Sequence, residues 1–137
     1  MKGIKAICFT VVCVLLLKTN VRAADFTTPI KIRCTCYTST EGSVTASGEP
    51  VREGVLAGKR SWMGKTAILY DMDMNIIGIY EFKDTGAGID TDGDGKGDTI
   101  KNGKSIDVYR DTMERCREWI KNYGDYVLLQ IIEGAAG

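Results

Sequence analysis

The chain has 137 residues, and its 18 basic and 18 acidic side chains balance to no net charge. It contains no histidine, which excludes a Ser-His-Asp triad, cysteine–histidine catalysis and histidine-ligated zinc. If the chain is an enzyme, we therefore expect carboxylates to be its acids and bases.

The first 23 residues have the order of a secretory signal peptide. Two lysines precede a run of 12 apolar residues, which is followed by "VRA". Small residues before a cleavage point place the predicted cut after Ala23. The apolar run is too short for a membrane span, which needs about 20 residues. We expect a secreted protein of the extracellular space or cell wall, with no stable membrane insertion once the signal is removed.

Residues 24–137 form the predicted mature domain, which is long enough for one hydrophobic core. Loss of the signal leaves 14 basic and 18 acidic residues, a net charge of −4. An acidic domain without a basic stripe argues against nucleic acid as a partner. We expect a monomer.

Several short strands are predicted along this domain. Residues 29–38, "PIKIRCTCYT", alternate apolar and polar side chains, which is typical of a half-buried strand. Residues 66–71 and 75–82 predict two strands joined by a turn, and residues 125–132 predict a last strand buried on both faces. With one helix, this pattern indicates a small β-barrel with a packed helix.

The helix is predicted in "DTMERCREWIKNYG", residues 111–124. Asp111 is the expected N-cap and Gly124 the expected end. Its apolar side is expected to contain Met113, Cys116, Trp119, Ile120 and Tyr123.

Three cysteines remain in the mature domain: Cys34, Cys36 and Cys116. Outside the cytoplasm, one pair can form a disulfide. Cys34 and Cys36 lie two apart on one strand face, so they would strain to pair with each other. A bridge from either one to Cys116 is predicted, with one thiol left over. The alternative, three buried apolar cysteines, remains open.

Residues 83–109 hold six aspartates, and the middle of this stretch reads "DTDGDGKGD". Its spacing matches positions 1, 3, 5 and 9 of an EF-hand calcium loop, which here are Asp90, Asp92, Asp94 and Asp98. Position 12 is Lys101 rather than glutamate, so we expect a weak extracellular calcium loop with a Kd of about 10⁻⁴ M. The alternative is a solvated acidic turn that holds no metal. Repulsion among the carboxylates argues against this alternative, because such a loop is more stable with a bound cation.

Four segments in order, "TCYTSTEGSVTASG", "KDTG", "IKNGKSIDVY" and "YVLLQI", resemble the 3D (three-aspartate) domain family. The resemblance covers residues 32–133 and implies a six-stranded double-psi β-barrel with one packed helix near the C-terminus. Related folds occur in lytic transglycosylases, rare lipoprotein A-like proteins and expansins. The family places its last two aspartates closer together than the 23 positions found here, so residues 88–99 are interpreted as an acidic insert.

The resemblance implies cleavage of peptidoglycan glycan strands by lytic transglycosylation. In that reaction the β-1,4 bond between N-acetylmuramic acid and N-acetylglucosamine breaks, and a 1,6-anhydro ring forms. One carboxylic acid serves both steps, first as acid to the leaving oxygen and then as base to the 6-hydroxyl. No water nucleophile and no cofactor are needed, which relaxes the two-carboxylate geometry of ordinary glycosidases.

By this resemblance, Asp107 of "SIDVY" is the expected acid/base, and Asp84 of "KDTG" is expected to assist it. Apolar neighbours on a strand would favour the protonated form that an acid needs. Contacts with substrate are expected from Tyr37, Thr45, Lys59 and Thr85.

The first aspartate of the family pattern is missing. The corresponding stretch, "LAGKRSWMGKT", has Lys59 near that place, and a lysine does not replace a carboxylate. A second hypothesis is therefore a barrel that binds wall glycan or protein without cleaving it. A third is a calcium-dependent structural or toxin-like secreted protein.

Overall fold

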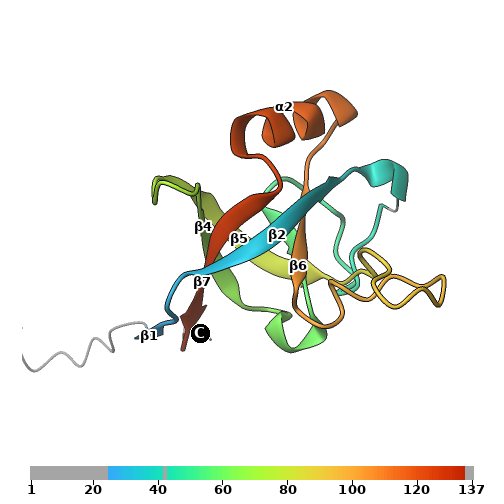
Figure 1. Cartoon of the computed structure of the whole chain (residues 1–137), viewed down its shortest axis with the longest axis horizontal. Helices are drawn as coiled ribbons and strands as arrows, with labels where there is room; N and C mark the ends of the chain where they lie inside the picture. The colour runs from blue at the N-terminus through green and yellow to red at the C-terminus, as the bar shows by residue number, and fades with distance from the viewer. Residues whose placement is uncertain (1–24, 42, 135–137) are drawn as a thin grey trace, which may run out of the picture.

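The computed structural model describes residues 25–41 and 43–134. The predicted signal peptide and its cleavage point lie outside the described residues. The described chain forms seven strands (Figure 1): β1 (Asp25–Phe26), β2 (Ile30–Tyr37), β3 (Val55–Ala57), β4 (Thr66–Tyr70), β5 (Ile76–Asp84), β6 (Ser105–Tyr109) and β7 (Tyr126–Glu133).

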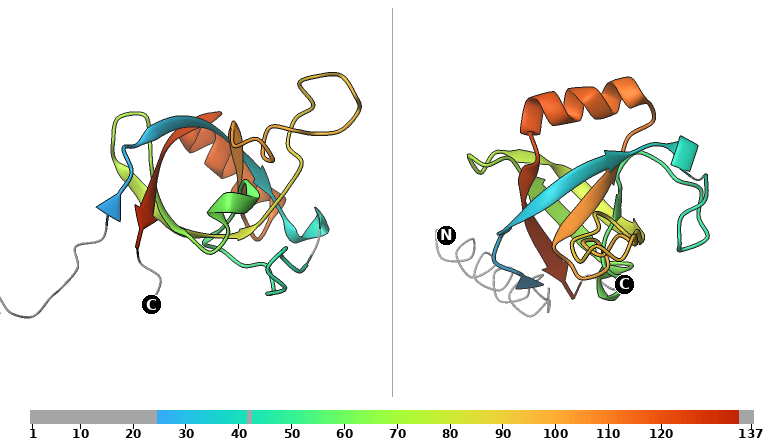
Figure 2. Two further views of the ribbon diagram at one scale, coloured as in Figure 1. Left: turned by 90° about the horizontal axis from the view of Figure 1, so that it is seen from below. Right: turned by 45° about the vertical axis from the view of Figure 1, so that its right-hand side comes forward.

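Six of these strands close into a barrel, which is seen end-on in the left panel of Figure 2. The order is β7–β2–β6–β3–β5–β4, and pairing of β4 with β7 completes the circle. The pairs β2–β6 and β3–β5 are parallel, and the other neighbours are antiparallel. β1 pairs with the end of β7 outside the barrel. This mixed barrel is compatible with the double-psi topology.

The barrel interior is filled by apolar side chains from alternate strand positions, because successive side chains of a strand point to opposite faces. The largest side chains that are almost fully buried are Leu56, Leu69, Phe82, Ile106 and Leu129. The prediction that β7 is buried on both faces is wrong. Residues 127, 129 and 131 are buried and residues 128, 130 and 132 are only partly so, because a barrel has a single interior.

One α-helix lies in the described residues, α2 (Met113–Tyr123), and it crosses one end of the barrel beside β2 (Figures 1 and 2). With it, the predicted class is confirmed: a mainly β, six-stranded barrel with one helix near the C-terminus. No helix of the described chain has the length and apolar character to cross a membrane.

The cap of α2 differs from the prediction. Thr112, not Asp111, is the N-cap, and its hydroxyl accepts a hydrogen bond of 3.2 Å from the Arg115 backbone N–H. The backbone N–H of Asp111 instead donates to Glu53, which holds that residue outside the helix. Gly124 ends the helix as predicted, with a φ of 69°, a conformation that favours glycine.

The apolar side of α2 is narrower than predicted. Cys116 and Trp119 are buried, whereas Met113 and Ile120 are about half exposed, at 53% and 49%. The helix contacts the barrel through β2, so one stripe of side chains is enough to make that contact.

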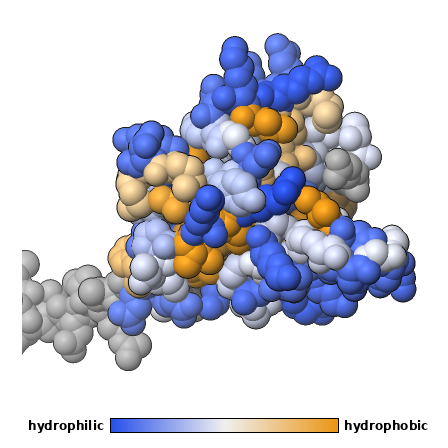
Figure 3. Space-filling view, viewed as in Figure 1, coloured by the Kyte–Doolittle hydropathy of each residue, from blue (hydrophilic) through white to orange (hydrophobic). Residues whose placement is uncertain are grey.

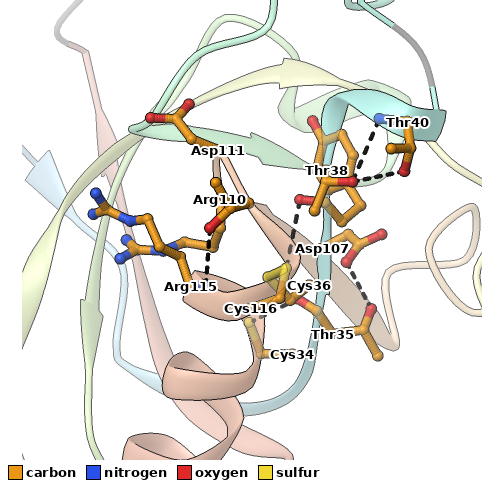
Figure 4. The surroundings of a disulfide bond; sticks show 12 residues. Cys34, Thr35, Cys36, Thr38, Thr40, Asp107, Arg110, Asp111, Arg115 and Cys116 are labelled. Atoms are coloured by element: carbon orange, nitrogen blue, oxygen red, sulfur yellow. Dashed lines mark hydrogen bonds between the residues drawn. A yellow bond between two sulfur atoms is a disulfide. The ribbon is translucent and has the colours of Figure 1, made fainter.

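A disulfide joins Cys36 of β2 to Cys116 of α2 (Figure 4). The sequence left Cys34 and Cys36 as alternative partners. The Cα atoms of the bonded pair are 5.6 Å apart, within the range that a disulfide spans.

Cys34 is the free cysteine of the described chain and points into the core. Burial, reinforced by the charge of Asp107, raises the pKa of its thiol to about 12, so it stays an unreactive thiol at neutral pH.

Candidate functional site

A cavity of about 520 Å³ lies against the outer face of the barrel, within the usual size range of ligand clefts. Its walls come from β2, β3, β5 and β6 and from the segment that follows β5. The lining residues are Thr35, Cys36, Tyr37, Val44, Ala57, Asp84, Thr85, Gly86, Ala87, Gly88, Ile89, Ser105 and Asp107. Both aspartates expected to be catalytic are among them.

Strand register brings the two aspartates together. Ala57 of β3 pairs with Asp107 of β6 on one side and with Asp84 of β5 on the other. Thr35 of β2 pairs with Asp107 from the far side. Two strand spacings therefore separate the backbones of Asp84 and Asp107, about 10 Å. The methyl side chain of Ala57 leaves the space between the two carboxylates open.

Asp107 lies between Ile106 and Val108, which are fully buried in the barrel. Alternation along β6 therefore turns Asp107 to the outer face and into the cavity, where its carboxylate is partly buried. The Thr35 hydroxyl donates a hydrogen bond of 2.9 Å to Asp107 Oδ1 (Figure 4). This arrangement fixes the carboxyl group at the cavity wall, within reach of a bound molecule.

Asp84 is held by three donors. Its Oδ1 accepts the backbone N–H groups of Ala46 and Thr85, both at 2.9 Å, and its Oδ2 accepts the Tyr37 hydroxyl at 3.0 Å. Three hydrogen bonds fix the orientation of a side chain much more firmly than one. Asp84 thus connects the loop around Ala46, strand β2 and the turn at Thr85, which suits a supporting role.

Tyr37 links the two aspartates electrostatically. Burial, and then the negative charge of Asp84, raise the pKa of the Tyr37 phenol, and Asp107 adds to the rise. Its ring packs edge-on against Tyr109, with centroids 5.4 Å apart. The phenol therefore stays a hydrogen-bond donor to Asp84 at neutral pH.

We predict that Tyr37 makes stability depend on alkaline pH. Because the folded pKa lies above the unfolded value near 10, its contribution is complete below about pH 10 and is lost as the pH rises further. Tyr37→Phe should reduce the alkaline slope of the unfolding free energy by about one proton, about 1.4 kcal/mol per pH unit. Urea denaturation at stepped pH measures this, and equal slopes in the two proteins would contradict it.

The structure brings two of the four expected substrate contacts to the cavity, Tyr37 and Thr85. Thr45 is not among the lining residues. It is buried, and its hydroxyl is hydrogen-bonded to Ser47 and to the Glu49 carbonyl. The Lys59 ammonium lies over the Trp62 ring, 4.7 Å from its centroid. For these two residues substrate contact stays a prediction.

Sequence reasoning did not single out several of the lining residues, among them Thr35, Ala57 and Ser105. The strand alternation in "IRCTCY" already placed Thr35 on the face opposite Cys34. The pairing of Thr35 with Asp107 depends on a parallel contact between β2 and β6, which lie about 70 residues apart. No local pattern in the sequence carries that information.

The acidic segment 90–98 forms a loop that projects beside the cavity, and Figure 3 shows it as a hydrophilic projection at lower right. Carboxylate oxygens of Asp90, Asp92 and Asp98 all lie within 4.8 Å of one another. Asp94 is outside this group, although it was expected to belong to the calcium loop. Hydrogen bonds from the backbone N–H groups of Gly93 and Gly95 lower the pKa of Asp90.

We predict that calcium stabilises the fold through this loop. With a Kd of about 10⁻⁴ M, about 1 mM calcium should raise Tm by about 5 °C. Asp92→Asn should abolish the shift, and Asp94→Asn should leave most of it. Differential scanning calorimetry with calcium and with chelator measures both. Superimposable melting curves for the wild type would end the calcium interpretation.

The base of the acidic loop is tied to the cavity wall. Thr99 is buried, its hydroxyl accepts the Ile89 backbone N–H at 2.8 Å, and it contacts the Ser105 hydroxyl, also at 2.8 Å. Ser105 opens β6, two residues before Asp107. Gly88 has a φ of +85°, and a Cβ there would lie 2.7 Å from the Ile100 backbone nitrogen, so this close approach requires glycine. The base of the acidic loop therefore contacts the start of β6, the strand that carries Asp107.

In comparisons with known proteins, no family model and no curated protein matches this chain.

Proposed function

We propose that this chain is a secreted peptidoglycan lytic transglycosylase built on a double-psi barrel of the 3D-domain kind. One observation carries the proposal: Asp84 and Asp107 flank Ala57 in the strand register and line a single cavity of about 520 Å³. The cavity also presents the hydroxyl groups of Thr35, Thr85 and Ser105. Carboxylates and hydroxyls are the side chains that hydrogen-bond sugar hydroxyls.

In this mechanism Asp107 acts on the glycosidic bond between N-acetylmuramic acid and N-acetylglucosamine. The carboxylic acid gives its proton to the leaving glycosidic oxygen as the bond from that oxygen to the anomeric carbon breaks. The resulting carboxylate then accepts the proton of the 6-hydroxyl, whose oxygen bonds to the same anomeric carbon. Asp107 gives up one proton and regains one, so the mechanism requires no second acid and no resident cofactor.

Asp84 positions the site in this scheme. The hydrogen bonds that Asp84 accepts hold the Tyr37 phenol and the turn at Thr85 at the cavity wall. Its negative charge, about two strands away, favours the positive charge that develops on the sugar ring in the transition state. Thr35 keeps the carboxyl group of Asp107 directed at the cavity through its hydrogen bond of 2.9 Å.

The second candidate is a barrel that binds wall glycan without cleaving it. The position of Lys59 favours it, because this residue stands near the missing family aspartate and its ammonium lies over Trp62. A cavity with two carboxylates instead of the family's three could still bind a glycan, but it would lack one of the charges that the family pattern provides for cleavage.

Digestion of purified sacculi separates the two candidates. We expect the purified chain to release 1,6-anhydro-muropeptides, identified by mass spectrometry. A folded protein that sediments with sacculi and releases no anhydro product would refute the transglycosylase and leave the binding module. Failure to sediment with sacculi would refute the binding module.

A further inference from the structure

A second hollow lies between α2 and the barrel, with a volume of about 130 Å³. We call it the α2 pocket. Its lining comes from β5, from α2 and from the residue that follows β6. The polar and aromatic side chains of the lining are Tyr80, Arg110, Glu118, Trp119, Asn122 and Tyr123. The α2 pocket shares no lining residue with the cavity that contains the two aspartates, so the proposed function makes no use of it.

The guanidinium group of Arg110 is fixed at the wall of the α2 pocket from two sides. Its central carbon lies over the Trp119 ring, 5.6 Å from the centroid, and its Nη1 lies 3.0 Å from a Glu53 carboxylate oxygen. Glu53 is shared, because Arg115 contacts the other oxygen at 3.1 Å, and the two guanidinium groups lie close together in Figure 4. Two cations therefore face one carboxylate.

Arg110 also has more donors than partners. A guanidinium carries five N–H donors, and the ion pair with Glu53 engages one of its nitrogen atoms. The Arg110 Nε is buried and has no hydrogen-bond partner in the described chain. The group can therefore donate to a further acceptor that enters the α2 pocket.

The opposite charge in the α2 pocket comes from Glu118. This residue is exposed on α2, and Asn122 follows it by one helical turn, so the two side chains lie on the same face of the helix. Among the described residues, the ion pair of Arg110 is with Glu53 and not with Glu118. The α2 pocket thus presents a cation and an anion that a small molecule can bridge.

Three aromatic rings complete the lining. The Trp119 ring packs edge-on against Tyr80, with centroids 6.2 Å apart, and against Tyr123, with centroids 4.7 Å apart. Aromatic faces attract cations. Burial raises the pKa of Tyr80 to about 12, so its hydroxyl stays protonated and able to donate at neutral pH. The α2 pocket therefore has groups suited to both an anionic and a cationic end of a ligand.

We propose that the α2 pocket binds a small zwitterionic α-amino acid such as glycine or alanine. The carboxylate accepts hydrogen bonds from the Arg110 guanidinium and the Tyr80 hydroxyl, and the ammonium donates to the Glu118 carboxylate and the Asn122 amide oxygen. A volume of about 130 Å³ is well below that of clefts for drug-sized ligands, which begin at about 300 Å³, so bulky amino acids are excluded. The inference is independent of the proposed function.

Binding should be weak and should need both charges of the ligand. Ion pairs at exposed positions contribute little individually, so we expect a Kd of about 1 mM for alanine. Removal of either charged group from the ligand should weaken binding about tenfold, because a hydrogen-bonded charge of the protein then loses its partner. Salt should weaken binding further, since the Debye length falls from about 30 Å at 0.01 M to about 8 Å at 0.15 M.

An NMR titration of the purified chain with four matched compounds tests the proposal. The indole N–H signal of Trp119 is the reporter, and Trp62→Phe identifies it, because the chain has two tryptophans. Alanine is compared with propionate, which lacks the ammonium, with ethylamine, which lacks the carboxylate, and with phenylalanine, which is larger. We expect a saturable shift with alanine, about tenfold weaker binding of propionate and ethylamine, and none of phenylalanine. No saturation by about 20 mM alanine, or equal binding of any of the other three, would overturn the proposal.

Variants of α2 locate the binding. Glu118→Gln should lower the affinity for alanine about tenfold, to that of propionate. Glu114→Gln is the matched control, because it makes the same change one turn earlier on α2, at an exposed residue outside the lining. Arg110→Lys keeps the charge but loses the planar fork, and it should lower affinity several-fold. If Glu118→Gln binds alanine as the wild type does, the amino acid is bound elsewhere and the proposal fails.

The test holds even if one variant does not fold. Arg110 contacts Glu53, so Arg110→Lys can lose stability, and melting curves check for this loss. Glu118 is exposed and lies outside the ion pairs of the described chain, so Glu118→Gln should melt as the wild type does. A wild-type melting curve together with lost alanine binding in Glu118→Gln is the result that supports the proposal.

Discussion

Asp107→Asn is expected to lower the rate of anhydro-muropeptide release by about 10²–10⁴-fold, the usual contribution of general acid–base catalysis. Asparagine keeps the size of the side chain and can still contact the Thr35 hydroxyl, but it has no proton to transfer. The loss should appear in kcat rather than in KM, because substrate binding retains the remaining lining of the cavity. Muropeptide release followed by mass spectrometry over time measures it.

Two controls sharpen this result. Asp73→Asn makes the same chemical change at a turn outside the cavity lining, and it should retain the wild-type rate. Thr35→Ser keeps the hydroxyl that contacts Asp107, whereas Thr35→Val removes it. Valine should change the pH profile of the rate, and serine should largely preserve it. A fully active Asp107→Asn would show that the acid is another group.

The elements with long periodic patterns were predictable from the sequence. The alternation in "IKIRCTCY" corresponds to β2, and "DTMERCREWIKNYG" contains α2, with Gly124 at its end as expected. In both segments, the side-chain periodicity of the element repeats several times within one stretch. The placement of Asp107 on a strand between two apolar neighbours was also predicted, because Ile106 and Val108 flank it in the sequence.

The arrangement of the candidate site could not be predicted from local patterns. β3 has three residues, too few for any alternation to register, yet Ala57 in this strand sets the spacing between Asp84 and Asp107. The hydrogen bonds to Asp84 come from Tyr37 and Ala46, 47 and 38 positions away. Contacts of this kind are decided by barrel closure, which no short window of sequence contains.

The backbone geometry of the acidic loop explains why its carboxylates group differently from the prediction. The group of carboxylates in the acidic loop includes Asp98 and omits Asp94, because the glycines of the loop bend the chain away from even spacing. Gly93 and Gly95 both have φ near +80°, and their backbone N–H groups turn inward to Asp90. The EF-hand spacing therefore predicted that carboxylates gather in this loop, but it did not predict which of the four aspartates lie together.

Removal of the Cys36–Cys116 disulfide is expected to cause the largest loss of stability of any change considered. The bond closes a loop between residues 80 positions apart, for which chain entropy alone gives about 4–5 kcal/mol, and measured values for native disulfides are commonly about 2–5 kcal/mol. A domain of this size is typically stable by only about 5–15 kcal/mol. The double variant Cys36→Ala/Cys116→Ala should therefore unfold at much lower denaturant concentration.

Cys34→Ala is the matched control, because it removes a sulfur atom from the same strand while leaving the bond intact. We expect it to cost about 1 kcal/mol, the effect of a small change in core volume. Added reductant should destabilise the wild type and Cys34→Ala alike and leave the double variant unchanged. Peptide mapping should recover the fragments around Cys36 and Cys116 as one linked species. Cys36 also lines the cavity and neighbours Thr35, so loss of the disulfide should loosen the strand that positions Asp107. The affinity for glycan should therefore fall even at denaturant concentrations at which the double variant is still folded.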